Sequence, residues 1–328
     1  MIHSLYFTTD GQFHPDLSQD ELVLALQDPQ GVLWVDFEAT PAEMDEKVLI
    51  DVFGFHPLAV DDALQETHVP KVDDWGKYLY IVLSAVVVEK DGDSLMEILE
   101  LDVFLGQNYM VTHHDHSIAA LQRVWNACQR DDRHLRRGVD HLLYRLVDEV
   151  VAQYMPVVEE IDDEIDRIED EIFDNPGPDI LARIFSLKRA VLQMRRILGP
   201  QREVLNRLAR DDYEVIDARA RVYFRDVYDH LVRLHDLTES LRDLIGGALD
   251  TYLSVINNRM NDIMKTLTVI TTLFMPISFV ASFFGMNFFY PIAQTDRWTS
   301  LPAFIATLVI MLFLPLVMVA WIRRRGWM

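Results

Sequence analysis

The fold class that the sequence predicts is a mixed α/β domain followed by a long α-helical stalk, which continues into the first of two transmembrane helices. Three observations predict it. Short runs of β-branched and aromatic residues fill the first third of the 328-residue chain. Apolar residues then recur every three or four positions, as on one face of a helix. Finally, the stretches 266–295 and 298–322 contain no Asp, Glu, Lys or Arg, and each exceeds the roughly 20 apolar residues that cross a bilayer.

Residues 1–133 are assigned to the α/β domain, which we expect on the cytoplasmic side. Gly, Asp and Pro punctuate its apolar runs, as they do at the ends of strands. The expected strands are Ser4–Thr8, Val32–Phe37, Tyr78–Val88 and Leu99–Thr112, and the expected helices are Asp20–Gln27 and Pro41–Phe53. A compact sheet with helices packed on it is the natural outcome of this pattern.

Residues 134–265 are assigned to the cytoplasmic helical stalk. A first helix is expected over Asp140–Phe173, and a second over Asp179–Leu198, which should end before Gly199 and Pro200. A third begins near Ala218 and meets no proline before Pro276, inside the first apolar stretch. At 1.5 Å per residue it would be a rod of roughly 100 Å. A monomer of this size should not cover the apolar stripe of such a rod, so self-association through the stalk is expected.

The C-terminal part is divided into a first transmembrane helix over 266–288, an outer loop over 289–297, a second transmembrane helix over 298–322 and a basic tail over 323–328. Lys265 and Arg259 precede the first span and Arg323 begins the basic tail, whereas the loop carries only Arg297. Because positive residues favour the cytoplasmic side, both termini are expected there. We therefore predict a multi-pass protein of the cytoplasmic (inner) membrane, with the lipid bilayer as a partner.

The net charge and the cysteine count of the chain restrict the classes of partner and the cellular compartment. A formal net charge of −22 argues against nucleic acid, whose phosphates require a basic face. The charge is compatible with attracting cations, although most of the acidic side chains can simply keep a cytosolic domain soluble. The single cysteine, Cys128, cannot form an intramolecular disulfide, which suits a reducing compartment.

The tripeptide Gly285-Met286-Asn287, followed by Phe288, stands at the outer end of the first apolar stretch. Met275-Pro276 lies ahead of it, and 224–230 (FRDVYDH) lies at the start of the long stalk helix. With these motifs, the chain from about Val60 to its C-terminus resembles the CorA family of magnesium and cobalt transporters.

The resemblance implies a homopentameric funnel in which the first spans line one axial pore and the second spans lie outside. It implies no enzyme activity and no organic cofactor; Mg²⁺ is both the transported ion and a regulatory ligand. Gly285, Met286 and Asn287 would be the selectivity filter. Mg²⁺ gives up its water reluctantly, and a ring of amide and carbonyl oxygens can accept hydrogen bonds from water still bound to the ion.

Below the filter, the resemblance implies a pore lined by one face of the first span and the end of the stalk. The lining residues would be Asn261, Met264, Leu267, Met275 and Ser278. Met264 and Leu267 could form a hydrophobic constriction that closes by losing water. Ordinary packing between helices is the alternative interpretation of the methionines.

Gating is implied by acidic residues at positions that hold Mg²⁺ between neighbouring subunits in this family: Asp61, Asp62, Asp226 and Asp250. Carboxylates gathered at an interface repel one another unless a cation lies between them, so internal Mg²⁺ would favour a closed state. Solvated surface acids are the alternative interpretation. The outer loop departs from the family pattern, because Asp296 is its only acid and Arg297 adjoins it.

Two alternatives remain for the function, together with one for a metal site. The cargo could be zinc, cobalt or nickel, as in the zinc-handling branch of the superfamily, although the central Met286 favours magnesium. The chain could instead be a membrane-anchored coiled-coil scaffold without a pore, which the polar line Asn261, Ser278 and Asn287 disfavours. His113, His114 and His116 could bind a transition metal, but neighbours on a strand point to opposite faces.

Overall fold

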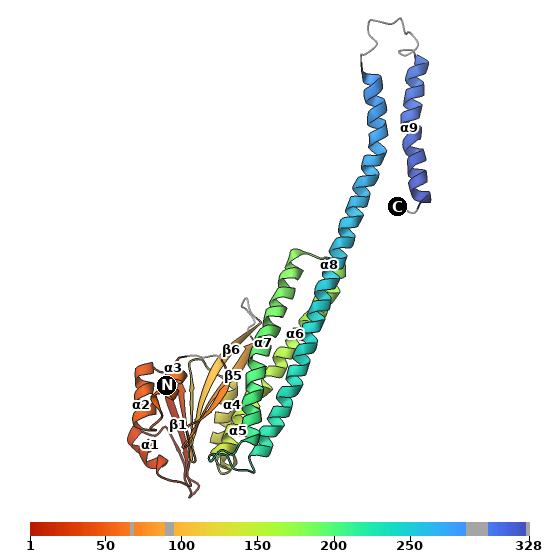
Figure 1. Ribbon diagram of the computed structural model, residues 1–328. Helices are drawn as coiled ribbons and strands as arrows, with labels where there is room; N and C mark the ends of the chain where they lie inside the picture. Colours follow the sequence, from red (N-terminus) through yellow and green to blue (C-terminus); the bar gives the residue numbers. More distant parts are fainter. Residues whose placement is uncertain (66–68, 89–94, 287–300, 326–328) are drawn as a thin grey trace. The chain divides into compact units, whose positions relative to one another are not determined.

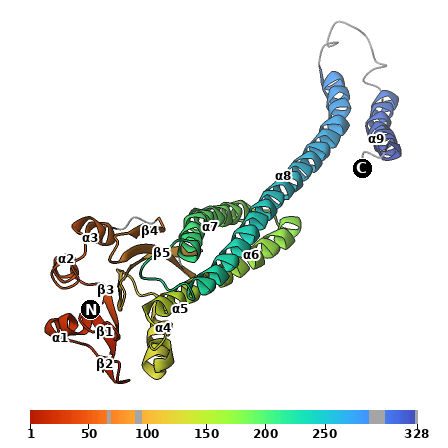
Figure 2. The same ribbon diagram turned by 60° about the horizontal axis from the view of Figure 1, so that its bottom comes forward.

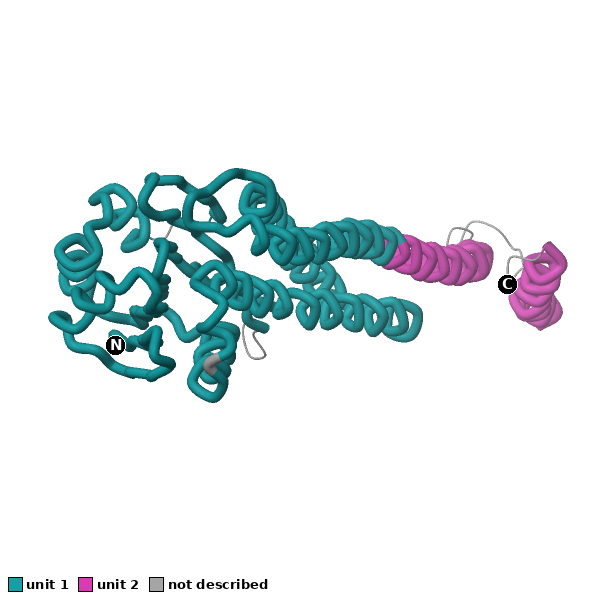
Figure 3. Tube along the Cα trace, turned by 90° about the horizontal axis from the view of Figure 1, so that it is seen from below, with its two compact units in different colours: residues 1–250 teal, residues 251–328 magenta. Residues whose placement is uncertain are grey.

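The computed structural model describes residues 1–65, 69–88, 95–286 and 301–325. The chain divides into two compact units, Met1–Asp250 and Thr251–Met328 (Figure 3). The first unit contains a β-sheet and a group of helices, and the second contains the apolar helices. Asn287 and Asp296 lie outside the described residues, as does the whole of the expected loop 289–297.

A seven-stranded sheet forms the centre of the first unit (Figure 1). Its strand order is β2-β1-β3-β7-β6-β5-β4, and all neighbours are antiparallel except β3 and β7. The strands are β1 Ile2–Phe7, β2 Phe13–Pro15, β3 Val32–Glu38, β4 Lys71–Asp74, β5 Leu79–Val88, β6 Met96–Leu105 and β7 Tyr109–His114. The run Leu99–Thr112, expected as one strand, is therefore two. The chain reverses at Gly106, whose amide donates to the Tyr109 carbonyl at 2.9 Å.

Helices cover both faces of the sheet because its strands alternate. Leu33, Val35 and Phe37 of β3 point to one face and join the core beneath α1 Gln19–Leu26, α2 Ala42–Asp51 and α3 Pro57–Leu64. Trp34 points to the other face, where its ring meets that of Trp125 from α4 Ala119–Arg130 at 4.7 Å between centroids. The expected strands and helices of this domain are thus largely confirmed.

Four further helices follow the sheet domain: α5 Val139–Ala152, α6 Tyr154–Asp174, α7 Pro178–Arg210 and α8 Arg221–Gly285. The short 3-10 helix η1 Asp132–His134 precedes them. The prediction of one continuous helix over Asp140–Phe173 is wrong, because a turn at Gln153 divides this segment into α5 and α6.

The predicted end of the second stalk helix before Pro200 is also wrong, since α7 continues through Pro200 to Arg210. Pro200 lacks an amide hydrogen and would normally end or kink a helix. Here the next turn is held by packing. Gln201 is fully buried and its Oε1 accepts a hydrogen bond from the Ser84 amide at 3.0 Å, while Val204 and Leu205 enter the core.

The long helix expected from near Ala218 is confirmed as α8, which has 65 residues. Within the first unit its apolar stripe follows a strict alternation of three and four residues. The buried positions are Phe224, Val227, Leu231, Leu234, Thr238, Leu241, Ile245 and Ala248. Helices of the same chain lie against α8 (Figure 2): Tyr144 of α5 stacks on Tyr223, and Arg195 of α7 pairs with Glu239 at 2.6 Å. The inference that this part of the stripe needs another copy to cover it is therefore wrong.

The second unit contains the remainder of α8 and α9 Leu301–Arg324. Both α8 and α9 contain segments long and apolar enough to cross a membrane. Many of their apolar side chains are exposed in the single chain; Phe279, for example, is 70% exposed and Leu316 66% exposed. Exposed apolar surface on this scale requires lipid or further protein to cover it.

Candidate ion pathway and metal sites

The residues predicted to line a pore lie on one face of α8. At 100° per residue, Asn261, Met264, Leu267, Met275, Ser278 and Gly285 fall within an arc of about 120°. All six are exposed in the single chain. Gly285 ends the helix and Met286 follows it, so only two members of the predicted filter are described.

Some polar side chains on this face have hydrogen-bond partners among the described residues and others do not. The Thr268 hydroxyl donates to the Met264 carbonyl at 2.8 Å, and the Thr271 hydroxyl to the Leu267 carbonyl at 2.9 Å. The side chains of Asn261 and Ser278, in contrast, have no hydrogen-bond partner in the part of the chain that the structure describes. A polar group without a partner is costly in hydrocarbon and inexpensive in water. The Asn261–Ser278 face therefore requires water or another copy of the chain.

The four acids predicted to hold regulatory Mg²⁺ lie on two helices of the first unit. Asp61 and Asp62 lie on α3, and Asp226 and Asp250 lie on α8. Asp226 and Asp250 are 24 positions apart, about 36 Å along a helix. Among the residues described, no group of three or more His, Cys, Asp or Glu could hold a metal ion. A cation at any of these acids would therefore need ligands from water or from a second copy.

The structure separates the two acids of α3. Asp62 is paired with Lys71, whose ammonium also lies 3.2 Å from Asp73. Partial burial lowers the pKa of Lys71, but the hydrogen bonds that its ammonium donates to these two carboxylates outweigh that effect and raise the pKa. Asp61 is exposed, and one of its carboxylate oxygens accepts from the Gln65 amide at 2.6 Å. Because its charge is not neutralised by Lys71, Asp61 is the better placed of the two to face a cation.

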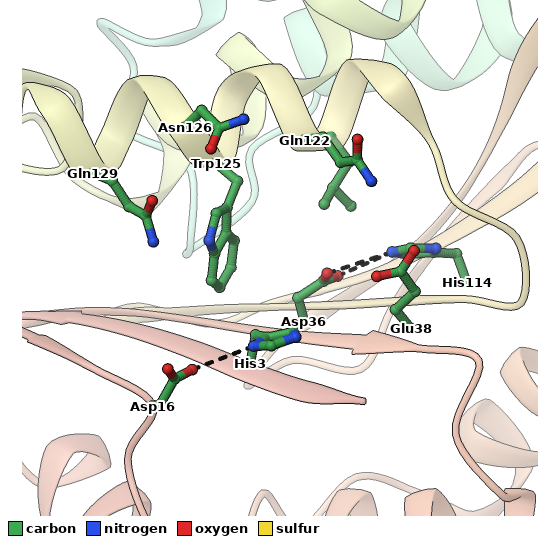
Figure 4. A pocket seen from close by; sticks show the side chains of 10 residues that line it. His3, Asp16, Asp36, Glu38, His114, Gln122, Trp125, Asn126 and Gln129 are labelled. Atoms are coloured by element: carbon green, nitrogen blue, oxygen red, sulfur yellow. Dashed lines mark hydrogen bonds and ion pairs between the residues drawn. The ribbon is translucent and has the colours of Figure 1, made fainter.

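The histidines at the end of β7 do not converge on one metal ion. His114 turns toward α4 and lies 3.3 Å from Asp36 of the neighbouring strand β3. Both residues line a cavity of about 400 Å³, which Trp125, Gln122 and Asn126 cover from α4 (Figure 4). A second pair lies in the same cavity, where His3 Nδ1 is 3.3 Å from Asp16 Oδ1. His116 contributes only its backbone carbonyl, 2.7 Å from His114 Nδ1.

His113 points to the opposite face, as its strand position predicts. Its Nε2 lies 3.4 Å from Asp45 of α2 and its Nδ1 lies 3.9 Å from Asp102 of β6. The Tyr80 hydroxyl donates to the other oxygen of Asp102 at 2.6 Å. Burial raises the pKa of Asp102 to about 6. Burial lowers the pKa of His113, but its two carboxylate partners outweigh that effect and raise it to about 9.

This buried network was not anticipated from the sequence. The sequence does carry one sign of it: Asp102 and Asp45 stand at positions that the apolar pattern places inside the domain. Buried charges occur almost only in pairs, so two buried carboxylates indicate a buried partner such as His113. The network joins α2 to β5, β6 and β7, so its role in this chain is to fix the sheet domain.

Comparison with known proteins places these features in one family. The CorA-like Mg²⁺ transporter family matches residues 29–324 of this chain. The cobalt/magnesium transport protein CorA of Thermotoga maritima is 32% identical over 309 residues, which cover 94% of this chain and 87% of the relative. The protein of the same name from Methanocaldococcus jannaschii is 25% identical over 90% of this chain and 91% of its own length.

A solved structure shows the same fold. The complete CorA magnesium transporter of Methanocaldococcus jannaschii superimposes with a TM-score of 0.84, and the match covers 100% of this chain and 99% of that one at 23% identity. The fold class predicted from the sequence is thus confirmed for the α/β domain, the long helix and the C-terminal apolar helix.

Proposed function

Because this chain belongs to the family of CorA-like Mg²⁺ transporters, we propose that it is a channel that carries Mg²⁺ into the cytoplasm, with Co²⁺ and Ni²⁺ as further ions. Five copies would surround one pore, with α8 inside and α9 outside. The protein would lie in the cytoplasmic membrane with both termini in the cytoplasm, because positive residues flank the apolar segments on that side.

One observation supports the pathway more than any other: the unpartnered polar groups on the Asn261–Ser278 face of α8. In a monomer surrounded by lipid, the Ser278 hydroxyl would be buried in hydrocarbon without a partner. Around a shared axis, the same face would border water. The helix is uninterrupted from Arg221 to Gly285, so a change at the cytoplasmic end of α8 could be transmitted along it.

The proposed filter is the ring of Gly285, Met286 and Asn287. Its neutral oxygens would bind the water shell of Mg²⁺ rather than strip it, since dehydration of this ion is slow and costly. A potential of 100 mV contributes about 2.3 kcal/mol per elementary charge, hence about 4.6 kcal/mol for a divalent cation. That energy drives uptake without a coupled reaction. Asp296 would attract cations at the outer mouth.

Closure is proposed to come from Mg²⁺ bound between neighbouring copies at Asp61 and Asp62 on α3 and at Asp226 and Asp250 on α8. Among the described residues of one chain, these acids form no complete metal site, and a cation shared between copies would relieve their repulsion. Falling internal Mg²⁺ would loosen the assembly and open the pore. Asp61 would contribute more than Asp62, which is already paired with Lys71.

Uptake into liposomes under an inside-negative potential tests the proposal. Mg²⁺, Co²⁺, Ni²⁺ and Zn²⁺ should be compared for the natural chain and for Asn287→Ala. We expect uptake of Mg²⁺ to exceed that of Zn²⁺, and the variant to lose most of this preference. Zn²⁺ transported better than Mg²⁺ would instead favour the zinc-transporting alternative, and no uptake of any of the ions would favour the scaffold.

A further inference from the structure

One cleft of the first unit gathers basic side chains, in a protein whose net charge is −22. The cleft, of about 490 Å³, lies where the connection after α4 meets the first turns of α5 and α8. Its lining consists of Asp131, Arg133, His134, Arg137, His141, Tyr144, Arg145 and Tyr223. Nothing in the proposed ion pathway uses these residues.

The charges in the cleft are not balanced. Arg133 is paired with Asp131, its Nε lying 2.9 Å from Oδ2, and Arg145 lies 3.3 Å from Asp148. Arg137 is exposed and forms no ion pair with any residue that the structure describes. The excess charge is thus positive, and guanidinium groups bind carboxylate or phosphate oxygens in pairs of parallel hydrogen bonds.

His141 provides an independent sign of a missing ligand. Its side chain is only 7% exposed, and its Nδ1 has no hydrogen-bond partner in the described parts of the chain. Burial and then the neighbouring charges of Arg137, His134 and Arg145 lower its pKa to about 4. The ring is therefore neutral at pH 7. A buried nitrogen without a partner is unusual in native proteins and calls for an explanation at this position.

Aromatic rings form the other wall of the cleft. Tyr144 and Tyr223 stack with centroids 5.0 Å apart and an interplanar angle of 30°, and the His141 ring meets Tyr223 edge-on at 5.6 Å. Tyr223 is 41% exposed, so part of its ring is available. Flat exposed rings beside cationic groups suit a ligand that combines a planar base with an anion, since bases stack on aromatic side chains.

We propose that this cleft binds a mononucleotide, with the phosphate held by Arg137 and its basic neighbours and the base stacked on Tyr223. The volume lies in the range of small-molecule sites, about 300 to 1,000 Å³. A second cavity of about 660 Å³ shares Arg137, His141 and Tyr223 and leaves room for the ribose. It is also lined by Asp140, Glu214 and Asp217, whose carboxylates suit ribose hydroxyls and keep the phosphate on the side of the basic cleft. The ligand would contact the start of α8, the helix that continues into the first apolar segment.

The test is calorimetric titration of the full chain in detergent, without divalent cations, using AMP, ADP, adenosine and ribose 5-phosphate as probes. We expect AMP and ADP to bind, and adenosine and ribose 5-phosphate to bind at least about tenfold more weakly than AMP. Arg137→Gln should weaken AMP binding about tenfold or more, because charge-assisted hydrogen bonds to phosphate are lost. Tyr223→Leu should weaken AMP but leave ribose 5-phosphate unchanged.

Arg130→Gln is the matched control, because Arg130 is an exposed arginine at the end of α4 that does not line the cleft. It should bind AMP as the natural chain does. Absence of AMP and ADP binding at millimolar concentration would overturn the proposal. Ribose 5-phosphate binding as tight as AMP, or an equal loss in Arg130→Gln and Arg137→Gln, would overturn it as well. Both variants alter exposed side chains, so neither should prevent folding.

Discussion

Replacing Leu231 with alanine should lower the free energy of unfolding of the first unit by about 2.5 to 5 kcal/mol. Leu231 is fully buried in the α8 stripe, and helices of its own chain provide the cover. The substitution removes three carbon groups, each contributing about 0.8 kcal/mol when buried, and leaves a cavity that adds to the loss. Leucine and alanine are both good helix formers, so helix propensity contributes little to the difference.

Leu244→Ala is the matched control on the same helix, because Leu244 is 46% exposed. Its partial burial predicts a loss of about 1 kcal/mol, with no closed cavity. Unfolding in urea should be followed by near-ultraviolet circular dichroism, which reports the packed Trp34 and Trp125 rings. Equal losses in the two variants, or a loss at Leu231 that depends on protein concentration, would refute the conclusion that one chain covers its own stripe.

Three further predictions follow from the described contacts. Folding raises the pKa of His113 from about 6.5 to about 9. The protonated ring therefore contributes its full stabilisation below about pH 6.5, and this contribution is lost as pH rises through 9. The free energy of unfolding should fall across this window by up to about 1.4 kcal/mol per pH unit, and an equally steep fall in His113→Gln would contradict the assignment. Burial raises the pKa of the Cys128 thiol to about 12, so the thiolate fraction at pH 8, and with it the rate of alkylation, should be on the order of a thousandfold lower in the folded chain than in urea. Similar rates in the two states would contradict this burial. Asp226→Asn should raise the Mg²⁺ concentration that half-protects the assembly from trypsin by about fivefold or more, whereas the neighbouring exposed acid in Asp229→Asn should leave it unchanged; an equal shift in both variants would remove Asp226 from the regulatory site.

The parts of the fold that could be predicted are those with a sustained apolar run or a sustained period. The β-branched and aromatic run Val32–Phe37 and the helical spacing after Ala218 correspond to β3 and α8. Strands β2 and β4 have three and four residues, which is too short for alternation to be recognised. Leu99–Thr112 was expected as one strand because both of its halves are β-rich, and periodicity does not reveal a reversal of the chain.

The remaining differences arise from contacts between distant segments. Whether Pro200 ends a helix depended on the contact of Gln201 with Ser84, which lies 117 positions earlier. Whether the α8 stripe was covered depended on helices that the sequence locates but does not orient. The same holds for the sites: the Ser278 face follows from helix geometry alone, whereas the cleft around His141 exists only because α5 and α8 bring Tyr144 and Tyr223 together.

The claim that the Ser278 face of α8 borders the ion pathway can be tested directly by cysteine accessibility. Ser278→Cys and Leu273→Cys, each combined with Cys128→Ser, place a thiol at similar depth but about 140° apart around the helix. In liposomes, a charged, membrane-impermeant thiol reagent should block Mg²⁺ uptake by the Ser278→Cys chain and leave uptake by the Leu273→Cys chain unchanged. Block at Leu273 with none at Ser278 would show that a different face of α8 borders the water, and would contradict the proposed pathway.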